Sequence, residues 1–328
     1  MRNSAPNVQP EACVTLYLDD EDVSSLLSLQ DAIGCVERAF RLLSDRGAVN
    51  EVRHRTHAST VSLNVMWSIV PADGVLGVKA YPVVRTDVTQ GAVLTLLLYS
   101  SATGKLLAVV KADRLGQLRT GAASAVATRA LAPPESEVLA LYGTGFQAET
   151  QVLALAAVMP ALRSVRVVGR NLARRDEFVR RMRGRVPAEV RGVEPNQAPH
   201  GADVVVTATG SADPVLLGDW VRPGTHVNCV GSNAAMKREA DRVLLERAAL
   251  IVVDDRDVAA RECGDLLANG WGQDGVVELG DILTRVTPGR AQTDDITVFE
   301  SQGLAVQDVV CAALVYSRAM ETGRGRPI

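Results

Sequence analysis

The chain has 328 residues, of which 47% are hydrophobic and 22% are charged, and its formal net charge is −3 at pH 7. This length predicts two domains of ordinary size, and the charge gives no electrostatic reason to expect a nucleic acid or a membrane as partner. Five widely spaced cysteines without a CxxC pair argue against a disulfide framework and against a metal site. No apolar stretch is long enough to cross a bilayer, and the start lacks the apolar core of a secretory signal. We therefore expect a reduced, cytoplasmic protein.

The first part of the chain is typical of a mostly antiparallel sheet with helices. Residues 1–11 are expected to form a loose tail, and negative charges at 19–22 mark the first turn of a short helix. Gln30–Leu43 carries apolar residues at helical spacing, which predicts a helix with one buried face. Strands are predicted at Val14–Leu18, Thr60–Val70, Gly77–Val84, Ala92–Ser100 and Leu106–Val110, the last two as a hairpin.

Basic residues in this part have two possible interpretations each. Arg53 and Arg55 alternate with His54 and Thr56, so the two arginines share one face of a strand. They form either an exposed polar edge or an anion clamp that faces a cleft. Lys79 lies inside an apolar strand, where it is either a solvated edge residue or a buried amine. Burial would lower its pKa and allow proton transfer near neutral pH.

A helix rich in small residues is predicted at Leu118–Leu131, which permits close packing. Arg119 lies at the expected start of this helix, where hydrogen-bond donors can converge on an anion. Pro133 and Pro134 then mark a boundary in the chain.

The second part alternates strands and helices, which is the pattern of a parallel sheet. Strands are predicted at Val138–Tyr142, Ser164–Val168, Ala188–Val193, Asp203–Ala208, His226–Val230 and Leu250–Val253. A final helix is predicted at Val306–Ala319.

A glycine turn follows the first of these strands and opens a helix. Its sequence is Gly143-Thr144-Gly145-Phe146-Gln147-Ala148. In a dinucleotide-binding turn, the first glycine allows the bend and the second lets the backbone approach a pyrophosphate, which then lies on the N–H groups of the helix. The alternative is a glycine turn in some other α/β unit.

Three further turns are expected to border the cofactor, because ligands of such sheets bind beyond the carboxyl ends of the strands. The second strand ends at Arg170 and Asn171, and no carboxylate stands where NAD-binding folds hold the ribose 2′-OH. We therefore favour NADP(H) over NAD(H). Arg174 and Arg175 follow one turn later, and these two arginines fit an ordinary solvated helix face as well. The other two turns are Thr207-Ala208-Thr209 and Val230-Gly231-Ser232.

With these residues laid out, the chain resembles the ornithine cyclodeaminase/mu-crystallin family from about residue 14 to 320. Four blocks carry the resemblance, and the closing Phe299–Leu304 and Asp308 agree with the C-terminal signature of the family. The blocks are Gly77-Val78-Lys79, Thr103-Gly104 leading to Leu118–Ser124, Gly143–Ala148, and Glu262-Cys263-Gly264-Asp265-Leu266.

The resemblance implies an α/β protein in which a Rossmann-type parallel sheet domain is inserted into a second, α+β substrate-binding and dimerisation domain. We place the substrate domain at residues 1–124 plus 302–328 and the NAD(P)-binding domain at 125–301. It also implies a homodimer, a bound NAD or NADP and a small imino or amino acid as substrate.

Site residues follow from the matching positions. The resemblance implies that Arg53, Lys79 and Arg119 hold the substrate carboxylate, with Arg55 as an alternative to Arg53, and that Lys79 lies close to the reacting carbon. Glu262 joins the substrate-binding set, and Asn233 joins Lys79 in the catalytic set. The implied cofactor-binding residues are Thr95, Arg119, Thr120, Gly143, Thr144, Gly145, Phe146, Gln147, Arg170, Asn171, Thr207, Ala208, Thr209, Val230, Gly231 and Ser232.

Three positions depart from the cyclodeaminase pattern. Asn64 and Asn233 stand where cyclodeaminases resemble one another in having a carboxylate, and Met66-Trp67 replaces their usual Met-Pro. An asparagine cannot accept a proton from an amine as a carboxylate can. We therefore expect an NADPH-dependent reductase of a C=N bond next to a carboxylate. The alternatives are a cyclodeaminase or amino-acid dehydrogenase on the same fold, and a cofactor-bound, non-enzymatic binding protein.

Overall fold

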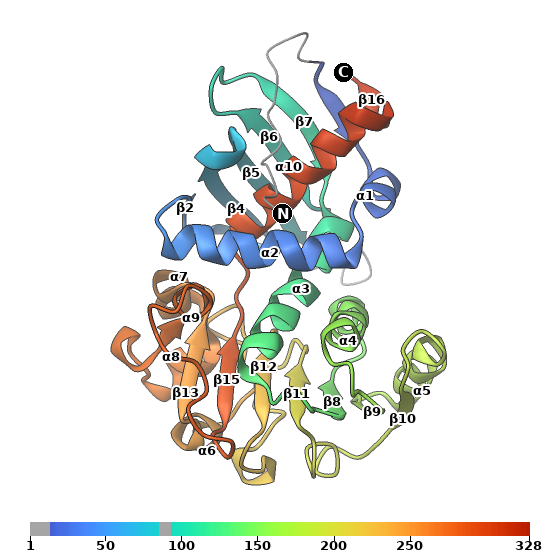
Figure 1. The fold of residues 1–328 in the computed structure, drawn as a ribbon, viewed down its shortest axis with the longest axis vertical. Helices are drawn as coiled ribbons and strands as arrows, with labels where there is room; N and C mark the ends of the chain where they lie inside the picture. Colours follow the sequence, from blue (N-terminus) through green and yellow to red (C-terminus); the bar gives the residue numbers. More distant parts are fainter. Residues whose placement is uncertain (1–13, 85–92) are drawn as a thin grey trace. The chain divides into compact units, whose positions relative to one another are not determined.

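The computed structural model describes residues 14–84 and 93–328, so the expected tail at 1–11 and the first residue of the strand predicted at Ala92–Ser100 lie outside the described residues. The chain divides into two compact units, which we describe separately (Figure 1). Unit 1 combines the chain up to Arg119 with Leu304–Ile328, and unit 2 is Thr120–Gly303. The sequence analysis had placed these divisions at 124/125 and 301/302.

Unit 1 is built on a mixed, mainly antiparallel sheet with the strand order β16-β1-β7-β6-β5-β4-β2, with β3 also paired to β4. Among the described strands of this sheet, β1 and β7 form the only parallel pair. The strands are β1 (Leu16–Leu18), β2 (Val49–Asn50), β3 (His54–Ala58), β4 (Val61–Val70), β5 (Val75–Val84), β6 (Thr95–Ser100), β7 (Leu106–Lys111) and β16 (Arg326–Pro327), and the helices are α1 (Asp20–Leu26), α2 (Leu29–Ser44) and α10 (Ala305–Thr322).

One face of this sheet is covered by α10, which packs on β4, β5 and α2 (Figure 1). Strand β4 alternates between the two faces, so that Asn64 and Met66 are buried while Leu63 and Ile69 are exposed. The exposed fraction of Leu63 is 49%. The sheet therefore carries apolar side chains on both faces, and in the described residues one of the faces is left partly open.

Helix α3 (Asp113–Leu131) begins five residues before the helix predicted at Leu118. Arg119 therefore lies in the second turn of the helix, and the expectation that it stands at the helix start is wrong. The polar residues Asp113 and Gln117 and the intervening Gly116 hide this first turn in the sequence. Asp113 ties it to the preceding segment, because its carboxylate accepts the backbone N–H of Leu94 at 3.4 Å.

Unit 2 is a doubly covered parallel sheet with the strand order β10-β9-β8-β11-β12-β15-β13-β14. The strands are β8 (Val138–Tyr142), β9 (Ser164–Val168), β10 (Glu189–Gly192), β11 (Val204–Thr207), β12 (His226–Cys229), β13 (Leu250–Val253), β14 (Val277–Glu278) and β15 (Thr297–Glu300). The helices wholly within it are α4 (Phe146–Val158), α5 (Leu172–Met182), α6 (Arg242–Arg247), α7 (Arg256–Glu262), α8 (Gly264–Asn269) and α9 (Leu279–Leu283).

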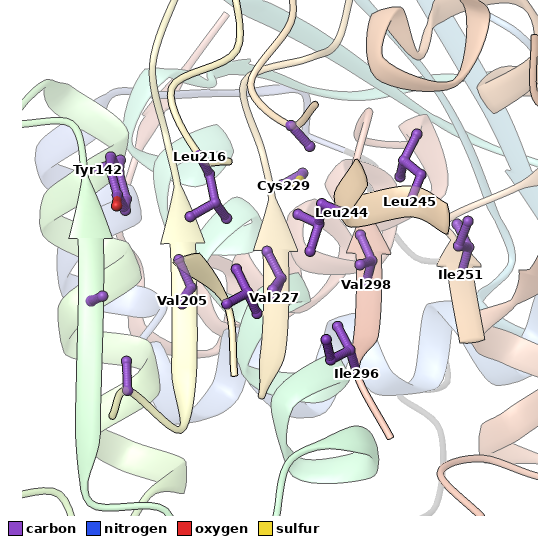
Figure 2. Packing of buried hydrophobic residues seen from close by; sticks show 14 of the residues in the cluster. Tyr142, Val205, Leu216, Val227, Cys229, Leu244, Leu245, Ile251, Ile296 and Val298 are labelled. Carbon is purple, nitrogen blue, oxygen red and sulfur yellow. The ribbon is translucent and has the colours of Figure 1, made fainter. Parts of the chain in front are cut away.

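Apolar clusters lie on both faces of this sheet. On one face, Val205, Val227 and Val298 from neighbouring strands pack against Leu216 and Leu244 (Figure 2). On the other face, residues of β8, β9, β10 and β11 pack against α4 and α5. Strands with both faces buried read as continuous apolar runs, which is why most of them could be predicted. Strands β14 and β15 were not predicted from the sequence.

None of the helices in residues 14–84 and 93–328 combines the length and the hydropathy that crossing a membrane requires.

Candidate active site

Lys79 is a buried residue of β5 on the face that α10 covers. Its side chain is only 2% exposed, and its Nζ lies 2.6 Å from Oδ2 of Asp308 in α10. Gly77 lies on the same face of β5, and a Cβ there would meet Cγ2 of Val309 at 2.7 Å. The glycine therefore lets α10 approach the strand closely enough for Asp308 to reach the lysine.

Arg119 joins the same carboxylate from α3. Its Nε lies 3.2 Å from Oδ1 of Asp308, and its terminal nitrogen donates to Oε1 of Gln307 at 3.2 Å. The Nε2 atom of Gln307 is buried and has no hydrogen-bond partner. Two cations thus share one buried carboxylate, which leaves one net positive charge in the cluster and one spare amide donor.

Burial and charge shift the pKa values of this cluster in opposite directions. Burial lowers the pKa of Lys79 to about 8; Asp308 opposes this shift, while Arg119 and Arg53 add to it. Burial alone would raise the pKa of Asp308, but Arg119 and Lys79 outweigh it, and the pKa is lowered. Asp308 is therefore ionised at neutral pH, and Lys79 can gain or lose a proton close to neutrality.

The two arginines of the predicted anion clamp lie on this same side of the sheet. Arg53 precedes β3, is buried, and has its Nε 3.2 Å from Sδ of Met66. Arg55 is directly opposite Asn64, which shares a face with Met66. The predicted alternation is confirmed, since His54 is exposed and its ring lies 5.0 Å from that of Trp67.

Thr95 is separated from this cluster. It is paired directly with Ala80 on β5, whereas Lys79 is paired with Leu96. Because neighbouring residues of a strand point to opposite faces, Thr95 faces away from Lys79.

In unit 2, the glycine turn has the backbone that its sequence predicts. Gly143 has φ of +120°, and a Cβ on it would meet the carbonyl oxygen of Ala208 at 2.3 Å. Gly145 is the N-cap of α4, with no side chain capping the helix, and a Cβ on it would meet no atom within 4 Å. The space that a side chain at Gly145 would fill is therefore open, and within the first turn of α4 the Oε1 atom of Gln147 is buried and has no hydrogen-bond partner.

Neighbouring turns pack against this one along the carboxyl edge of the sheet. A Cβ on Gly169 would meet Thr144 at 3.1 Å, and a Cβ on Gly231 would meet the carbonyl oxygen of Thr209 at 2.1 Å. The turns after β8, β9, β11 and β12 therefore form one contiguous rim.

Arg170 is exposed on this rim, and the side chain of Asn171 caps α5 by accepting the N–H of Arg174. Thr120 contacts α4 through its carbonyl oxygen, which accepts from Gln151 at 3.3 Å, while Phe146 is exposed.

Each asparagine at the positions that depart from the cyclodeaminase pattern makes a polar contact. The amide of buried Asn64 donates to the carbonyl oxygen of Tyr81 at 3.4 Å. Oδ1 of Asn233 accepts from Lys237 at 3.0 Å. Glu262 is buried at the end of α7 in unit 2, whereas Lys79 belongs to unit 1.

Three buried carboxyl groups of unit 2 were missed by the sequence analysis as site residues. They are Glu239, Asp265 and Glu300, and burial raises the pKa of each, to about 6 for Asp265. Oxygens of Asp265 and Glu300 and the sulfur of Cys229 lie within 4.8 Å of one another. For Asp265 and Glu300, an acidic residue next to apolar ones was the signal that could have found them, as with Asp308 between Val306 and Val310, whereas Glu239 lies in a polar segment and gives no such signal.

A sequence model described as the ornithine cyclodeaminase/mu-crystallin family matches residues 13–323. Ketimine reductase mu-crystallin of Mus musculus is 38% identical over 224 residues, which cover 68% of each chain. Alanine dehydrogenase of Archaeoglobus fulgidus is 32% identical over 320 residues, covering 96% of this chain and 98% of the relative.

A solved structure agrees with these matches. Δ1-pyrroline-2-carboxylate reductase of Thermococcus litoralis, in complex with NADH and L-proline, is 30% identical with a TM-score of 0.91, covering 95% of this chain and all of that one. The predicted Rossmann-type sheet with a second α+β domain is thereby confirmed. The chain belongs to the ornithine cyclodeaminase/mu-crystallin family.

Proposed function

We propose that this protein is an NAD(P)H-dependent oxidoreductase that reduces the C=N bond of a small imino acid. The observation that carries the proposal is the buried cluster in which Lys79 and Arg119 share Asp308. A site with excess positive charge and a lysine whose pKa is about 8 suits a substrate that has a carboxylate next to an imine. The names of two relatives state substrates of this kind: one is a ketimine reductase and the other a Δ1-pyrroline-2-carboxylate reductase.

In this proposal, the guanidinium groups of Arg119 and Arg53 bind the substrate carboxylate, because their planar forks match its two oxygens. Lys79 holds the imine nitrogen and supplies its proton. Reduction adds a hydride to the carbon and a proton to the nitrogen, and the nicotinamide supplies the hydride. Asp308 keeps Lys79 and Arg119 in place and balances their charge. Orientation by these fixed groups contributes much of the rate.

The carboxyl rim of unit 2 fits a dinucleotide. Gly145 leaves open the space that its side chain would fill at the N-terminus of α4, where a pyrophosphate would accept backbone N–H groups. For the ribose, the exposed Arg170 and the absence of a carboxylate in Gly169–Asn171 favour a 2′-phosphate, hence NADP(H). The structures of two relatives contain NADH and NAD, so both cofactors have to be compared.

The partly open face of the unit 1 sheet supports the proposed homodimer. It carries Val61, Leu63 and Ile69, each of which is more than a third exposed. An apolar surface of this kind on a sheet is typical of protein association, and the archaeal alanine dehydrogenase among the solved relatives is described as a dimer. Cys35, Cys229, Cys263 and Cys311 are free thiols, which fits the proposed cytoplasmic location.

One alternative has a specific observation in its favour. The match to alanine dehydrogenase spans nearly the whole length of both chains, and the same Lys79 and Arg119 could hold an α-keto acid that condenses with ammonia. A cyclodeaminase is less favoured, because Asn64 and Asn233 cannot act as bases.

The test follows NADPH absorbance while cyclic ketimines, and α-keto acids with ammonia or amines, are added, with NADH in parallel. Rapid oxidation by a cyclic imine without added ammonia is the expected result. A strict requirement for ammonia would instead identify an amino-acid dehydrogenase. Ammonia release from ornithine or lysine with catalytic NAD would identify a cyclodeaminase. Tight ligand binding without any turnover would point to a non-enzymatic binding protein.

A further inference from the structure

Glu239 is a fully buried carboxylate beneath the rim of unit 2, and no sequence motif used above includes it. It is 0% exposed and lies between the turn after β11 and the turn after β12. Oε1 accepts the backbone N–H of Thr209 at 2.5 Å and its hydroxyl at 2.7 Å. Oε2 accepts the backbone N–H of Gly231 at 2.6 Å and the hydroxyl of Thr207 at 2.8 Å.

The two carboxylate oxygens of Glu239 divide the hydrogen bonds from the two turns between them. Each oxygen accepts one backbone N–H, and the two N–H groups belong to different turns. A backbone N–H can only donate, and a buried one without an acceptor destabilises the fold. The two turns therefore keep their hydrogen bonds only while both oxygens of one side chain face them. Glu239 thus fixes the separation of the two turns.

Glu239 is itself held rigidly. Oδ1 of Asp265 accepts the backbone N–H groups of Glu239 and Ala240 at 2.8 and 3.1 Å. A Cβ on Gly264 would meet the carbonyl oxygen of Lys237 at 1.8 Å, and one on Gly231 would meet the carboxyl of Glu239 at 2.6 Å. The segment around Glu239 can therefore approach the rim this closely only because residues 231 and 264 are glycines.

We infer that Glu239 is a positioning residue for the nicotinamide cofactor, which acts through the turns Thr207–Thr209 and Val230–Ser232 without touching the cofactor itself. The inference rests on the proposed function, since it assumes that these turns border the cofactor. It assigns to Glu239 an effect on cofactor affinity and none on the holding of the imino acid, whose proposed ligands Lys79 and Arg119 belong to unit 1.

The decisive variant is Glu239→Gln, which preserves size but replaces one acceptor oxygen by a donor. Whichever way the amide turns, one backbone N–H then faces an NH₂ group. Dissociation constants for NADPH and NADH are measured from the fluorescence of the reduced cofactor on the full chain, next to kcat and the imine KM at saturating cofactor. The expected result is a cofactor Kd raised about tenfold or more, with the imine KM within about twofold of the wild type.

Two controls separate positioning from general destabilisation. Glu246→Gln removes an exposed carboxylate that pairs with Arg242 at 2.6 Å in the same unit, and it is expected to leave the cofactor Kd unchanged. Met182→Ala empties part of the core beside α5 and is expected to lower Tm without raising Kd in proportion. If Met182→Ala raises Kd as much as Glu239→Gln at the same loss of Tm, the inference is overturned.

If Glu239→Gln does not fold, Glu239→Asp is used. It keeps both acceptors but withdraws them by one methylene, and a raised cofactor Kd is again expected. An unchanged Kd in a folded Glu239 variant, together with cofactor binding by the wild type, overturns this inference alone. Failure of the wild type to bind either cofactor overturns the proposed function and the inference with it.

Discussion

Nζ of Lys79 lies 2.6 Å from Oδ2 of Asp308 although 229 residues separate them in the chain. The pair joins a sheet strand to the last helix of unit 1, and Arg119 completes it from α3. The proposed substrate cluster is therefore assembled only when Leu304–Ile328 has packed back onto the first part of the chain.

Replacing Lys79 by methionine is expected to abolish most of the turnover. The variant retains the length and apolar character of the side chain but lacks the proton and charge, so kcat should fall by about 100-fold or more. The Kd of NADPH should change little, since the proposed pyrophosphate and ribose contacts belong to unit 2. Lys105→Met, at an exposed position, is the matched control. A near-normal kcat in Lys79→Met would remove the lysine from the mechanism.

The pH profile should report the same lysine. If protonated Lys79 supplies the proton, the rate falls as pH rises through its pKa of about 8. Asp308 raises that pKa, so Asp308→Asn should move the alkaline limb to lower pH. It should also destabilise the protein by about 3 kcal/mol, because two buried cations lose their counter-charge. An alkaline limb that does not move in Asp308→Asn would contradict the assignment of the limb to Lys79.

Apolar runs and the glycine motif were sufficient to predict most strands of the parallel sheet and the turn after β8. Strand β8 and the start of α4 lie where the sequence places them, because a buried parallel strand is a continuous apolar run and Gly143 requires a positive φ. The start of α3 was wrong, since Asp113 and Gly116 are poor signals of a helix interior.

Long-range partners could not be predicted from local patterns. The sequence identifies Lys79 as unusual, but nothing near it identifies Asp308 as its partner. Likewise, Glu239 lies in a polar segment, and only the folded chain brings it under the turns at Thr209 and Gly231. Strand β15 was missed because only Val298 and Phe299 of its residues are apolar and it ends in the buried Glu300.

The two glycines of the cofactor turn should respond differently to alanine. Gly143→Ala is expected to destabilise unit 2, because φ is +120° and the new Cβ would lie 2.3 Å from the carbonyl oxygen of Ala208. Gly145→Ala should leave Tm nearly unchanged, because its Cβ meets no atom, yet it should raise the cofactor Kd by about tenfold by filling the pyrophosphate space. Thermal unfolding and cofactor titration of both variants check this contrast. Equal cofactor affinity in Gly145→Ala and the wild type would contradict binding at this turn.

A second charge pair ties α2 to α10 and should appear in acid unfolding. Both guanidinium nitrogens of Arg318 bind Asp31, at 2.6 and 2.9 Å, and hydrogen bonding to Arg318 is the main cause that lowers the pKa of Asp31 from 3.8 to about 2. A lowered carboxyl pKa stabilises the fold above about pH 4, and this stability is lost as pH falls through about 2. Because the pair is partly exposed, we expect about 1 kcal/mol.

Urea unfolding of Asp31→Asn checks this value. The free energy of unfolding should drop by about 1 kcal/mol at pH 7, and the difference from the wild type should shrink as pH falls from about 4 to 2. Glu37→Gln in the same helix is the control, because its pair with Arg41 is a surface i,i+4 contact of about 0.5 kcal/mol or less. A difference that persists unchanged at pH 2 would mean that the ion pair is not its source.

The partly open sheet face should decide the oligomeric state. Leu63 is 49% exposed on the face of β4 opposite to Asn64 and Met66, and Leu63→Asp would place a charge on the face proposed for the dimer contact. A buried, unpaired charge costs several kcal/mol at an interface, so sedimentation should change from dimer to monomer. Val286→Asp introduces the same charge at an exposed valine of unit 2 and should leave the dimer intact. If both variants sediment as the wild type does, the subunits associate through another surface. If the wild type is itself a monomer, the apolar face has a different partner and the homodimer proposal fails.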